Sequence, residues 1–457
     1  MRVVLLVVVL AACGDNTRYR YDSLVEVSGA SPYADSCNGA AQPGTSYPGL
    51  ELEPSLAIDP GDPGHLVAAW QQDRWSNGGA NGLGTAVSFD GGVTWRRSLP
   101  KFSHCAGGDY QRASDPWVSI AADGTPYAIS ISFDATTDRS AVLAASSRDG
   151  GATWDEPIAL LADDDPDVFN DKESITADPH DAGRAYAVWD RLTGLSHPMD
   201  PVGTGPSMLA RMTDGAWEPA RAIYDPGTDA QTIGNVIDVL PDGTLVDVFL
   251  RILMSSAKNP DFAIAAIRST DHGDTWSAPV VIAPAQGVEI AKNGVGIRTG
   301  EGLPQLAVDP DSGALYVAWQ DSGFDNMHSA IAVARSLDGG VTWSQPIQAN
   351  GDPDAFAFTP AIAAGNGGVG LFYYDTRLDD PSSPAFRVAA WLASSSDRGA
   401  TWSDERLSSA FDLRPAQPGS SYFLGDYQGL VANGATFVPL FAIAFVENDR
   451  SDIFVRP

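Results

Sequence analysis

The octet Ser88-Phe89-Asp90-Gly91-Gly92-Val93-Thr94-Trp95 decides the fold of this chain, because its pattern recurs. The pattern Ser-x-Asp-x-Gly-x-Thr-Trp returns at 147–154, 269–276, 336–343 and 395–402, so successive copies begin 59, 122, 67 and 59 residues apart. The interval of 122 spans two periods, and a shortened sequence at 213–217 occupies the place of the missing copy. A fixed period of this length indicates stacked supersecondary units.

A second repeat alternates with the octets. Each copy is an apolar strand, a turn at Asp or Asn, and another apolar strand, as in 306–308 and 315–319 on either side of Asp309. β-Branched and aromatic residues flanking such turns are typical of hairpins. Two hairpins per period predict a four-stranded antiparallel sheet, and radial repetition of such sheets gives a β-propeller. The turns of the seven copies lie at Asp59, Asp123, Asp178, Asp242, Asp309, Asn366 and Asn433.

The last repeat is incomplete. It has its first hairpin and a third strand at 453–455, but it lacks an octet. The segment 21–27 near the N-terminus is a candidate for its missing outer strand, and that pairing would close the ring and hide both edges. We therefore predict an all-β propeller of four-stranded antiparallel blades, with seven blades favoured and six as the alternative.

Composition and charge exclude some functions. The chain has 457 residues, with 46 glycines, 32 prolines and 44% hydrophobic residues, which suits a protein of strands and turns. Its formal net charge is -30, whereas nucleic-acid binding and docking on anionic lipid need a basic surface. We expect no nucleic-acid partner, and a self-repelling, soluble monomer.

The first residues predict export. Arg2 precedes an apolar run over 3–10, which is too short to span a bilayer and has the shape of a secretion signal. Leu10-Ala11-Ala12-Cys13 resembles the lipobox of bacterial lipoproteins, in which the cysteine is lipidated; an ordinary signal peptide is the alternative. We expect a signal peptide over 1–12, a lipidated tether with the candidate closing strand over 13–30, and one propeller domain over 31–457. The lipid would be the protein's only membrane contact, in the bacterial cell envelope, with the outer membrane, the periplasm or the cell surface all open.

Two further cysteines, Cys37 and Cys105, lie 68 residues apart. An even pair in an oxidising compartment predicts a disulfide, with two buried free thiols as the alternative. Chain entropy gives such a bond about 4 kcal/mol of stabilisation.

The octet resembles the Asp-box of bacterial sialidases and their relatives, and the resemblance covers most of the chain. We expect its aspartate to bond backbone N–H groups in a turn between outer strands, its glycine to be left-handed, and its tryptophan to wedge between neighbouring sheets. The octet is thus a structural element and should not be a catalytic site. The five aspartates are Asp90, Asp149, Asp271, Asp338 and Asp397.

Topology assigns function to one face. In an up-and-down blade the octets and the Asp or Asn turns share one rim, which we call the lower face. The starts of the first strands and the ends of the second strands share the opposite rim, the upper face, where a glycan or protein ligand is expected around the axis. The residues just before the first strands form a column that reads Glu53, Pro116, Lys172, Asn235, Leu303, Thr359 and Asp426.

The resemblance to sialidases implies a chemistry for this rim. Such enzymes use a tyrosine nucleophile with a glutamate partner, an aspartate as general acid and base, and arginines that hold the substrate carboxylate. The matching candidates here are Tyr427, Glu173 and Asp115. Substrate-binding candidates are Arg74, Arg191, Arg251, Arg377, Asp426 and Glu53.

Two functions follow from these residues. The first is an exo-acting, retaining glycoside hydrolase on terminal acidic sugars. The second is a non-catalytic propeller that binds glycan or protein, in which Asp–Arg pairs are rim salt bridges. The Arg-Ile-Pro signature of sialidases is absent, and seven blades differ from their usual six. The net charge of -30 also favours the second function, because it repels anionic glycans.

No cofactor is expected. The six histidines are scattered, which makes a zinc site improbable. The loop that carries Asp163, Asp164, Asp165, Asp167 and Asp171 is a weak candidate for structural calcium, but it lacks EF-hand spacing and a solvated acidic loop is the better interpretation.

Overall fold

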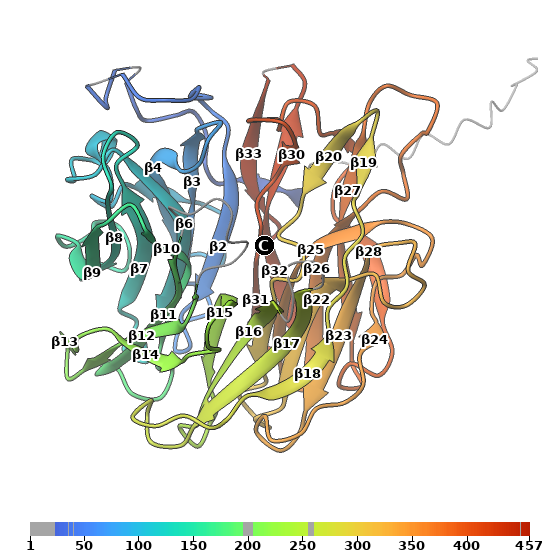
Figure 1. The fold of residues 1–457 in the computed structure, drawn as a ribbon. Helices are drawn as coiled ribbons and strands as arrows, with labels where there is room; N and C mark the ends of the chain where they lie inside the picture. Colours follow the sequence, from blue (N-terminus) through green and yellow to red (C-terminus); the bar gives the residue numbers. More distant parts are fainter. Residues whose placement is uncertain (1–22, 35, 40, 195–203, 255–259, 448) are drawn as a thin grey trace, which may run out of the picture.

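The computed structural model describes residues 23–34, 36–39, 41–194, 204–254, 260–447 and 449–457 (Figure 1). The expected signal peptide and the candidate lipidation site Cys13 lie outside these ranges. Within them the chain forms strands and one short 3-10 helix, η2 (His104–Ala106). No helix in these ranges has the length and apolar character needed to cross a membrane.

The strands form antiparallel four-stranded units, which confirms the predicted architecture. A single backbone pairing, Ala80 with Ala113, joins the first two units into one sheet. Blade 1 holds β2 (Leu52–Ile58), β3 (Leu66–Arg74), β4 (Ala80–Ser88) and β5 (Arg96–Ser98). Blade 2 holds β6 (Arg112–Ile120), β7 (Pro126–Phe133), β8 (Arg139–Ser146) and β9 (Ile158–Asp164). Blade 3 holds β10 (Val168–Ala177), β11 (Arg184–Thr193) and β12 (Ser207–Thr213), with β13 (Ala216–Trp217) and β14 (Arg221–Tyr224) beside β12.

The next three blades repeat this order. Blade 4 holds β15 (Ala230–Val239), β16 (Leu245–Met254), β17 (Pro260–Ser269) and β18 (Val280–Pro284). Blade 5 holds β21 (Gln305–Val308), β22 (Leu315–Asp321), β23 (Ala330–Ser336) and β24 (Ile347–Gln348). Blade 6 holds β25 (Ala357–Gly365), β26 (Gly368–Asp375), β27 (Arg387–Ser395) and β28 (Ser403–Arg406), with β29 (Phe411–Asp412) beside β27.

The seventh blade closes the ring with the N-terminal strand. Its order is β31 (Gly429–Asn433), β32 (Thr436–Phe445), β33 (Arg450–Val455) and β1 (Val25–Glu26), and Val25 pairs with Val455. Figure 1 shows blue β2 beside red β32 and β33, so the two ends of the described chain meet. The innermost strands β2, β6, β10, β15, β21, β25 and β31 contact one another in that order, and β31 contacts β2. The described residues therefore form a closed wheel of seven blades.

The Asp-boxes adopt the predicted turn. In the first, Asp90 accepts hydrogen bonds from the backbone N–H and the hydroxyl of Thr94, at 2.8 and 2.6 Å, and Gly92 is left-handed with φ 95°. Trp154 of the second box packs against the first blade and donates its Nε1–H to Thr85 at 2.9 Å. The shortened copy at 213–217 keeps only a tight hairpin, with Thr213 paired to Ala216.

The predicted disulfide is present between Cys37 and Cys105, whose Cα atoms lie 4.8 Å apart. Cys105 belongs to η2, so the bond fixes the segment that precedes the first blade against the connection between blades 1 and 2.

Candidate functional site

A recurring β-bulge shapes the upper end of the inner strands. In five of them the backbone pairing skips two residues, and the first of the two is left-handed. A bulge bends its strand and re-aims the side chain. The left-handed residues are Glu53, Asp115, Lys172, Gly234 and Thr359, with φ of 54°, 51°, 52°, 70° and 50°.

This repeated bulge corrects the column derived from the sequence. That column places Pro116 opposite Glu53 and Asn235 opposite Lys172, whereas the equivalent residues are Asp115 and Gly234. The column is therefore one residue out of register in blades 2 and 4.

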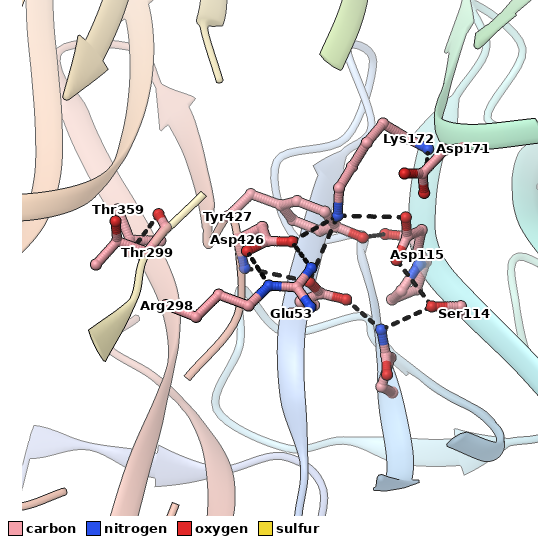
Figure 2. A network of polar contacts seen from close by, with 12 residues as sticks. Glu53, Ser114, Asp115, Asp171, Lys172, Arg298, Thr299, Thr359, Asp426 and Tyr427 are labelled. Carbon is pink, nitrogen blue, oxygen red and sulfur yellow. Dashed lines mark hydrogen bonds and ion pairs between the residues drawn. The ribbon is translucent and has the colours of Figure 1, made fainter. Parts of the chain in front are cut away.

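Lys172 is the centre of the charged groups at the axis (Figure 2). Its Nζ lies 2.6 Å from Asp426 Oδ2, 3.4 Å from Asp115 Oδ2 and 3.8 Å from Glu53 Oε1. All four side chains are buried. Arg298 approaches Asp426 with its Nε 3.0 Å from Oδ1. We call Glu53, Asp115, Lys172, Arg298 and Asp426 the axial cluster.

Neighbouring polar side chains hold the carboxylates of the axial cluster in place. Gln71 donates to Glu53 and also to Ser114 Oγ at 3.1 Å, and Ser114 in turn donates to Asp115 at 2.8 Å. Arg74 donates to the side-chain amide oxygen of Gln71 at 2.6 Å. The cluster is thus a preorganised hydrogen-bonded network that spans blades 1, 2, 3 and 7.

Burial and neighbouring charges shift the pKa values of the axial cluster in opposite directions. Burial raises the pKa of Glu53 to about 8, although Lys172 opposes the rise. Burial acts in the same direction on Asp115 and Asp426, but Lys172, Arg298 and hydrogen bonds together outweigh it at both groups, and the net pKa is lowered. The three nearby carboxylates raise the pKa of Lys172 well above its usual value despite its burial, so this lysine stays charged.

Tyr427 and Glu173 lie beside the axial cluster, but they are not hydrogen-bonded to each other. The Tyr427 hydroxyl donates to the backbone carbonyl of Pro116 at 3.3 Å, and its ring lies 5.3 Å from that of Trp117. Burial and the surrounding carboxylates raise the pKa of Tyr427 well above its usual value, and burial does the same for Glu173. Both residues line one cavity of about 20 Å³, enough for about one water molecule.

A hairpin covers the upper face next to the axis. Strands β19 (Ala291–Lys292) and β20 (Val295–Arg298) form it, and β20 pairs in parallel with β30 (Tyr422–Phe423), as Figure 1 shows. The backbone carbonyl of Thr299 accepts a bond from Thr359 at 3.0 Å, which fastens the hairpin to blade 6 (Figure 2). A side chain added at Gly300 would meet the Asp426 carbonyl at 2.3 Å, so the backbones approach closely here.

The candidate arginines do not converge on one point. Arg74 reaches the cluster, where its guanidinium lies 5.2 Å from the Phe423 ring, and Arg298 faces the same ring at 4.4 Å. Arg191 instead forms a two-pronged pair with Asp163 at 2.6 and 2.7 Å, so that acidic loop is partly neutralised. Arg377 pairs with Asp375 and Asp404 at 2.5 and 2.7 Å, and Arg251 lies half-buried on β16.

Two open cavities flank the hairpin away from the axis. The larger, about 570 Å³, lies between the hairpin and blade 6, and we call it the upper-face cleft. The smaller, about 410 Å³, lies on the other side, and Ile290 lines both. The residues of the upper-face cleft that carry its chemistry are Lys292, Asp352, Asp354, Phe356, Arg377, Asp379 and Phe386.

Lys172, Arg298 and the upper-face cleft were not among the predicted site residues. The available signal for Lys172 was that it is the only cation in its column, beside two carboxylates, two small polar residues, one proline and one leucine. No signal in the repeats indicates the cleft, because the hairpin that forms one wall is an insertion between blades 4 and 5.

Comparisons with known proteins agree with this geometry. Residues 255–421 match the BNR repeat-like domain family. The fold resembles an α-L-arabinofuranosidase from Fusarium graminearum, with 12% identity over 94% of this chain and 96% of that one and a TM-score of 0.51. An α-L-arabinanase from Penicillium chrysogenum gives 14% identity, 94% and 97% coverage and a TM-score of 0.50. The family model thus matches part of the chain, and the two solved structures share its β-propeller fold.

Two further comparisons were made. A microbial sialidase named Hadza Hz136 gives 18% identity over 85% of this chain and 72% of that one, with a TM-score of 0.49. No curated protein gives a significant sequence match. At these identities the similarity shows the fold, which is that of glycoside hydrolase-like propellers.

Proposed function

We propose that this propeller binds a neutral glycan in its upper-face cleft without hydrolysing it. The observation that carries the proposal is the difference in volume between the cavity at the axis and the upper-face cleft. The axial cavity beside Tyr427 has a volume of about 20 Å³, whereas the cleft has about 570 Å³. Ligand pockets for small molecules are typically about 300–1,000 Å³.

The chemistry of the cleft suits sugar hydroxyls. Lys292 is held by Asp379 at 2.7 Å and by two backbone carbonyls, and Arg377 lies 3.6 Å from the Trp391 ring between its aspartates. The two cations are therefore already neutralised. Among the described residues, no cation pairs with Asp352 or Asp354, so both carboxylates remain as acceptors.

Apolar surface completes the cleft. The half-buried Phe356 and the buried Phe386 give it aromatic walls for the C–H faces of a sugar ring. Unneutralised carboxylates repel a carboxylated or sulfated sugar, and the net charge of -30 adds to this repulsion. The ligand class is thus neutral, and the cavity beyond Ile290 leaves room for more than one ring.

A sialidase is the second candidate, and one observation favours it. Asp115, Glu173 and Tyr427 do lie together at the axis, because the last two line one cavity and Asp115 shares the network around Lys172. Against it, the tyrosine hydroxyl is bonded to a backbone carbonyl and its pKa is raised, whereas a nucleophile needs activation by a base. Two of the four candidate arginines, Arg191 and Arg377, are paired with their own aspartates.

A glycan array of neutral and sialylated oligosaccharides, followed by calorimetry with arabinobiose and cellobiose, tests the proposal. We expect neutral glycans to bind wild type, with affinity at least about tenfold weaker in Asp354→Asn and Phe356→Ala. Asp165→Asn, which changes an exposed aspartate next to blade 2, serves as the control and should bind like wild type. Turnover of a fluorogenic sialoside by wild type but not by Tyr427→Phe would establish the sialidase instead.

We further propose that Cys13 is lipidated and anchors the protein in the bacterial cell envelope. The disulfide Cys37–Cys105 supports export, because disulfides persist in oxidising compartments. Fractionation of cells that express wild type and Cys13→Ser tests this: the wild type should stay with membranes and the variant should be released. Equal partitioning of both would refute the anchor.

A further inference from the structure

A second cavity, on the lower face, has the opposite chemistry to the upper-face cleft. It has a volume of about 250 Å³ and lies between blade 5 and the Asp-box of blade 6. Its polar lining comes from Tyr316, Arg335, Ser344, Gln345 and Arg398, and no carboxylate is among the described residues that line it. We call it the lateral pocket.

The Tyr316 hydroxyl is the first sign that the lateral pocket takes a ligand. The side chain is 1% exposed, and within the described part of the chain its hydroxyl has no hydrogen-bond partner. An unsatisfied buried hydroxyl is costly and therefore rare, so each one requires an explanation. A ligand atom that accepts a hydrogen bond would supply the missing partner.

An equivalent position between blades 3 and 4 shows what is different here. Tyr186 pairs across its sheet with Arg211 as Tyr316 pairs with Arg335, and among the described residues its hydroxyl also lacks a partner. Arg211, however, is neutralised by Glu218 at 2.9 Å and by Asp274 at 2.8 Å. The difference between the two positions therefore lies in the charge around the tyrosine.

Both carboxylates are replaced around Arg335. Glu218 donates its backbone N–H to the Arg211 carbonyl, and Ser344 makes the same contact with Arg335, so Ser344 stands in the place of Glu218. The second carboxylate, Asp274, is the sixth residue of its octet, and the sixth residue of the octet beside Arg335 is Ala400. Ala400 therefore stands in the place of Asp274.

A second cation is added at the same place. In the octet beside Arg211 the fourth residue is His272, and its backbone carbonyl accepts a hydrogen bond from Arg211 at 2.8 Å. In the octet beside Arg335 the fourth residue is Arg398, and its backbone carbonyl accepts a hydrogen bond from Arg335 at 2.6 Å. In the described residues neither Arg335 nor Arg398 forms a salt bridge. Two guanidiniums without a carboxylate partner, beside a free hydroxyl, stand out on a chain with a net charge of -30.

We propose that the lateral pocket binds an oxoanion, either free or as a sulfate or carboxylate group carried by a sugar. The planar guanidinium matches such groups in geometry, and both arginines present donors that no carboxylate of the described chain neutralises. The Tyr316 hydroxyl donates the third bond, while Val333 and Ile347 supply an apolar wall. The site is independent of the upper-face cleft, because it lies on the opposite face and selects an anion, whereas the cleft selects a neutral ligand.

Calorimetric titration with inorganic sulfate, at constant ionic strength kept with chloride, tests the pocket. We expect one saturable site in wild type, with binding at least tenfold weaker in Tyr316→Phe and in Arg398→Gln. Tyr316→Phe removes a hydroxyl that bonds nothing in the described protein, so its thermal stability without sulfate should match that of wild type. Tyr186→Phe is the matched control and should bind sulfate as wild type does.

The source of the anion is resolved by two further titrants, a sulfated monosaccharide and glucuronate. Tighter binding of either sugar than of sulfate indicates a glycan, whereas sulfate as the best titrant indicates a free anion. Failure of wild type to saturate with any of the three, or equal affinity of Tyr316→Phe and wild type, overturns the proposal. Neither result bears on neutral glycan binding at Asp354, so the two proposals fail separately.

Discussion

Replacing Lys172 by methionine removes the cation that pairs with Asp115 and one of the two cations, with Arg298, that pair with Asp426. The lysine nitrogen lies 2.6 and 3.4 Å from Asp426 and Asp115, and all three side chains are buried. Breaking a buried ion pair by deleting one partner costs about 3–5 kcal/mol, because it leaves an uncompensated charge in the interior. Methionine has a similar length, so the packing change adds little.

The pH dependence of this loss distinguishes charge from packing. In wild type, Lys172, Arg298 and hydrogen bonds together keep the folded pKa of both aspartates below the unfolded value of about 3.9, so their contribution is present above that pH and is lost only as pH falls further. In the variant, Asp115 loses the largest influence that lowers its pKa, so burial raises it, whereas Asp426 keeps its pair with Arg298. Stability then falls as pH rises from about 4, and the deficit against wild type should grow between pH 5 and pH 8.

Urea unfolding followed by tryptophan fluorescence measures the deficit at pH 5 and pH 8. Lys101→Met is the matched control, since Lys101 pairs with Glu156 on the surface with 46% and 74% of the side chains exposed. Exposed pairs contribute at most about 1 kcal/mol. A loss in Lys172→Met no larger than in the control, or one that does not change with pH, would refute the role of Lys172 as the charge that compensates the axial cluster.

Three other variants probe the electrostatics, the cross-link and the Asp-box. Burial raises the pKa of Glu53 to about 8, against about 4.3 in the unfolded chain, so this group makes stability fall as pH rises between those values. Glu53→Gln should therefore weaken the dependence of the urea midpoint on pH between pH 5 and pH 8, and an unchanged dependence would contradict this. Cys37→Ser should lower the unfolding free energy by about 4 kcal/mol, as should reduction of the wild type, and an unaltered urea midpoint in both would show that the cross-link does not stabilise the fold. Asp149→Ala removes the acceptor for Thr153 and Ser147, so calorimetry should show a lower Tm and Trp154 emission should shift to the red, unlike in Glu156→Ala.

The repeats made the architecture predictable from sequence. The octet fixes one turn in five of the seven blades through local bonds, such as those of Asp90 to Thr94, and local bonds depend only on neighbours in sequence. The closing strand was predictable for a different reason, since the last blade lacked an outer strand and the segment 21–27 was the remaining candidate. The structure pairs Val25 and Glu26 of that segment with β33.

The site was less predictable because it depends on bulges and insertions. A bulge shifts the register by one residue, and the sequence does not mark where it begins: Pro follows the left-handed residue at Glu53, Asp115 and Thr359, but Glu173 follows it at Lys172. A column drawn without the bulges compares residues that face different directions. The pairing of rim arginines with aspartates, such as Arg191 with Asp163, likewise depends on loops whose path no repeat encodes.

The bulges also explain how one scaffold carries an asymmetric charge at its axis. Each bulge places one left-handed residue at the mouth of the wheel, and the identity of that residue is free to vary because the backbone conformation is fixed by the sheet around it. Blades 1 to 3 place Glu53, Asp115 and Lys172 there, whereas blades 4 and 6 place Gly234 and Thr359. Lys172 reaches Asp115 of the adjacent blade and Asp426 before blade 7, so opposite charges tie the blades together at the axis. In the functions proposed above, ligands bind away from the axis, at the upper-face cleft and at the lateral pocket.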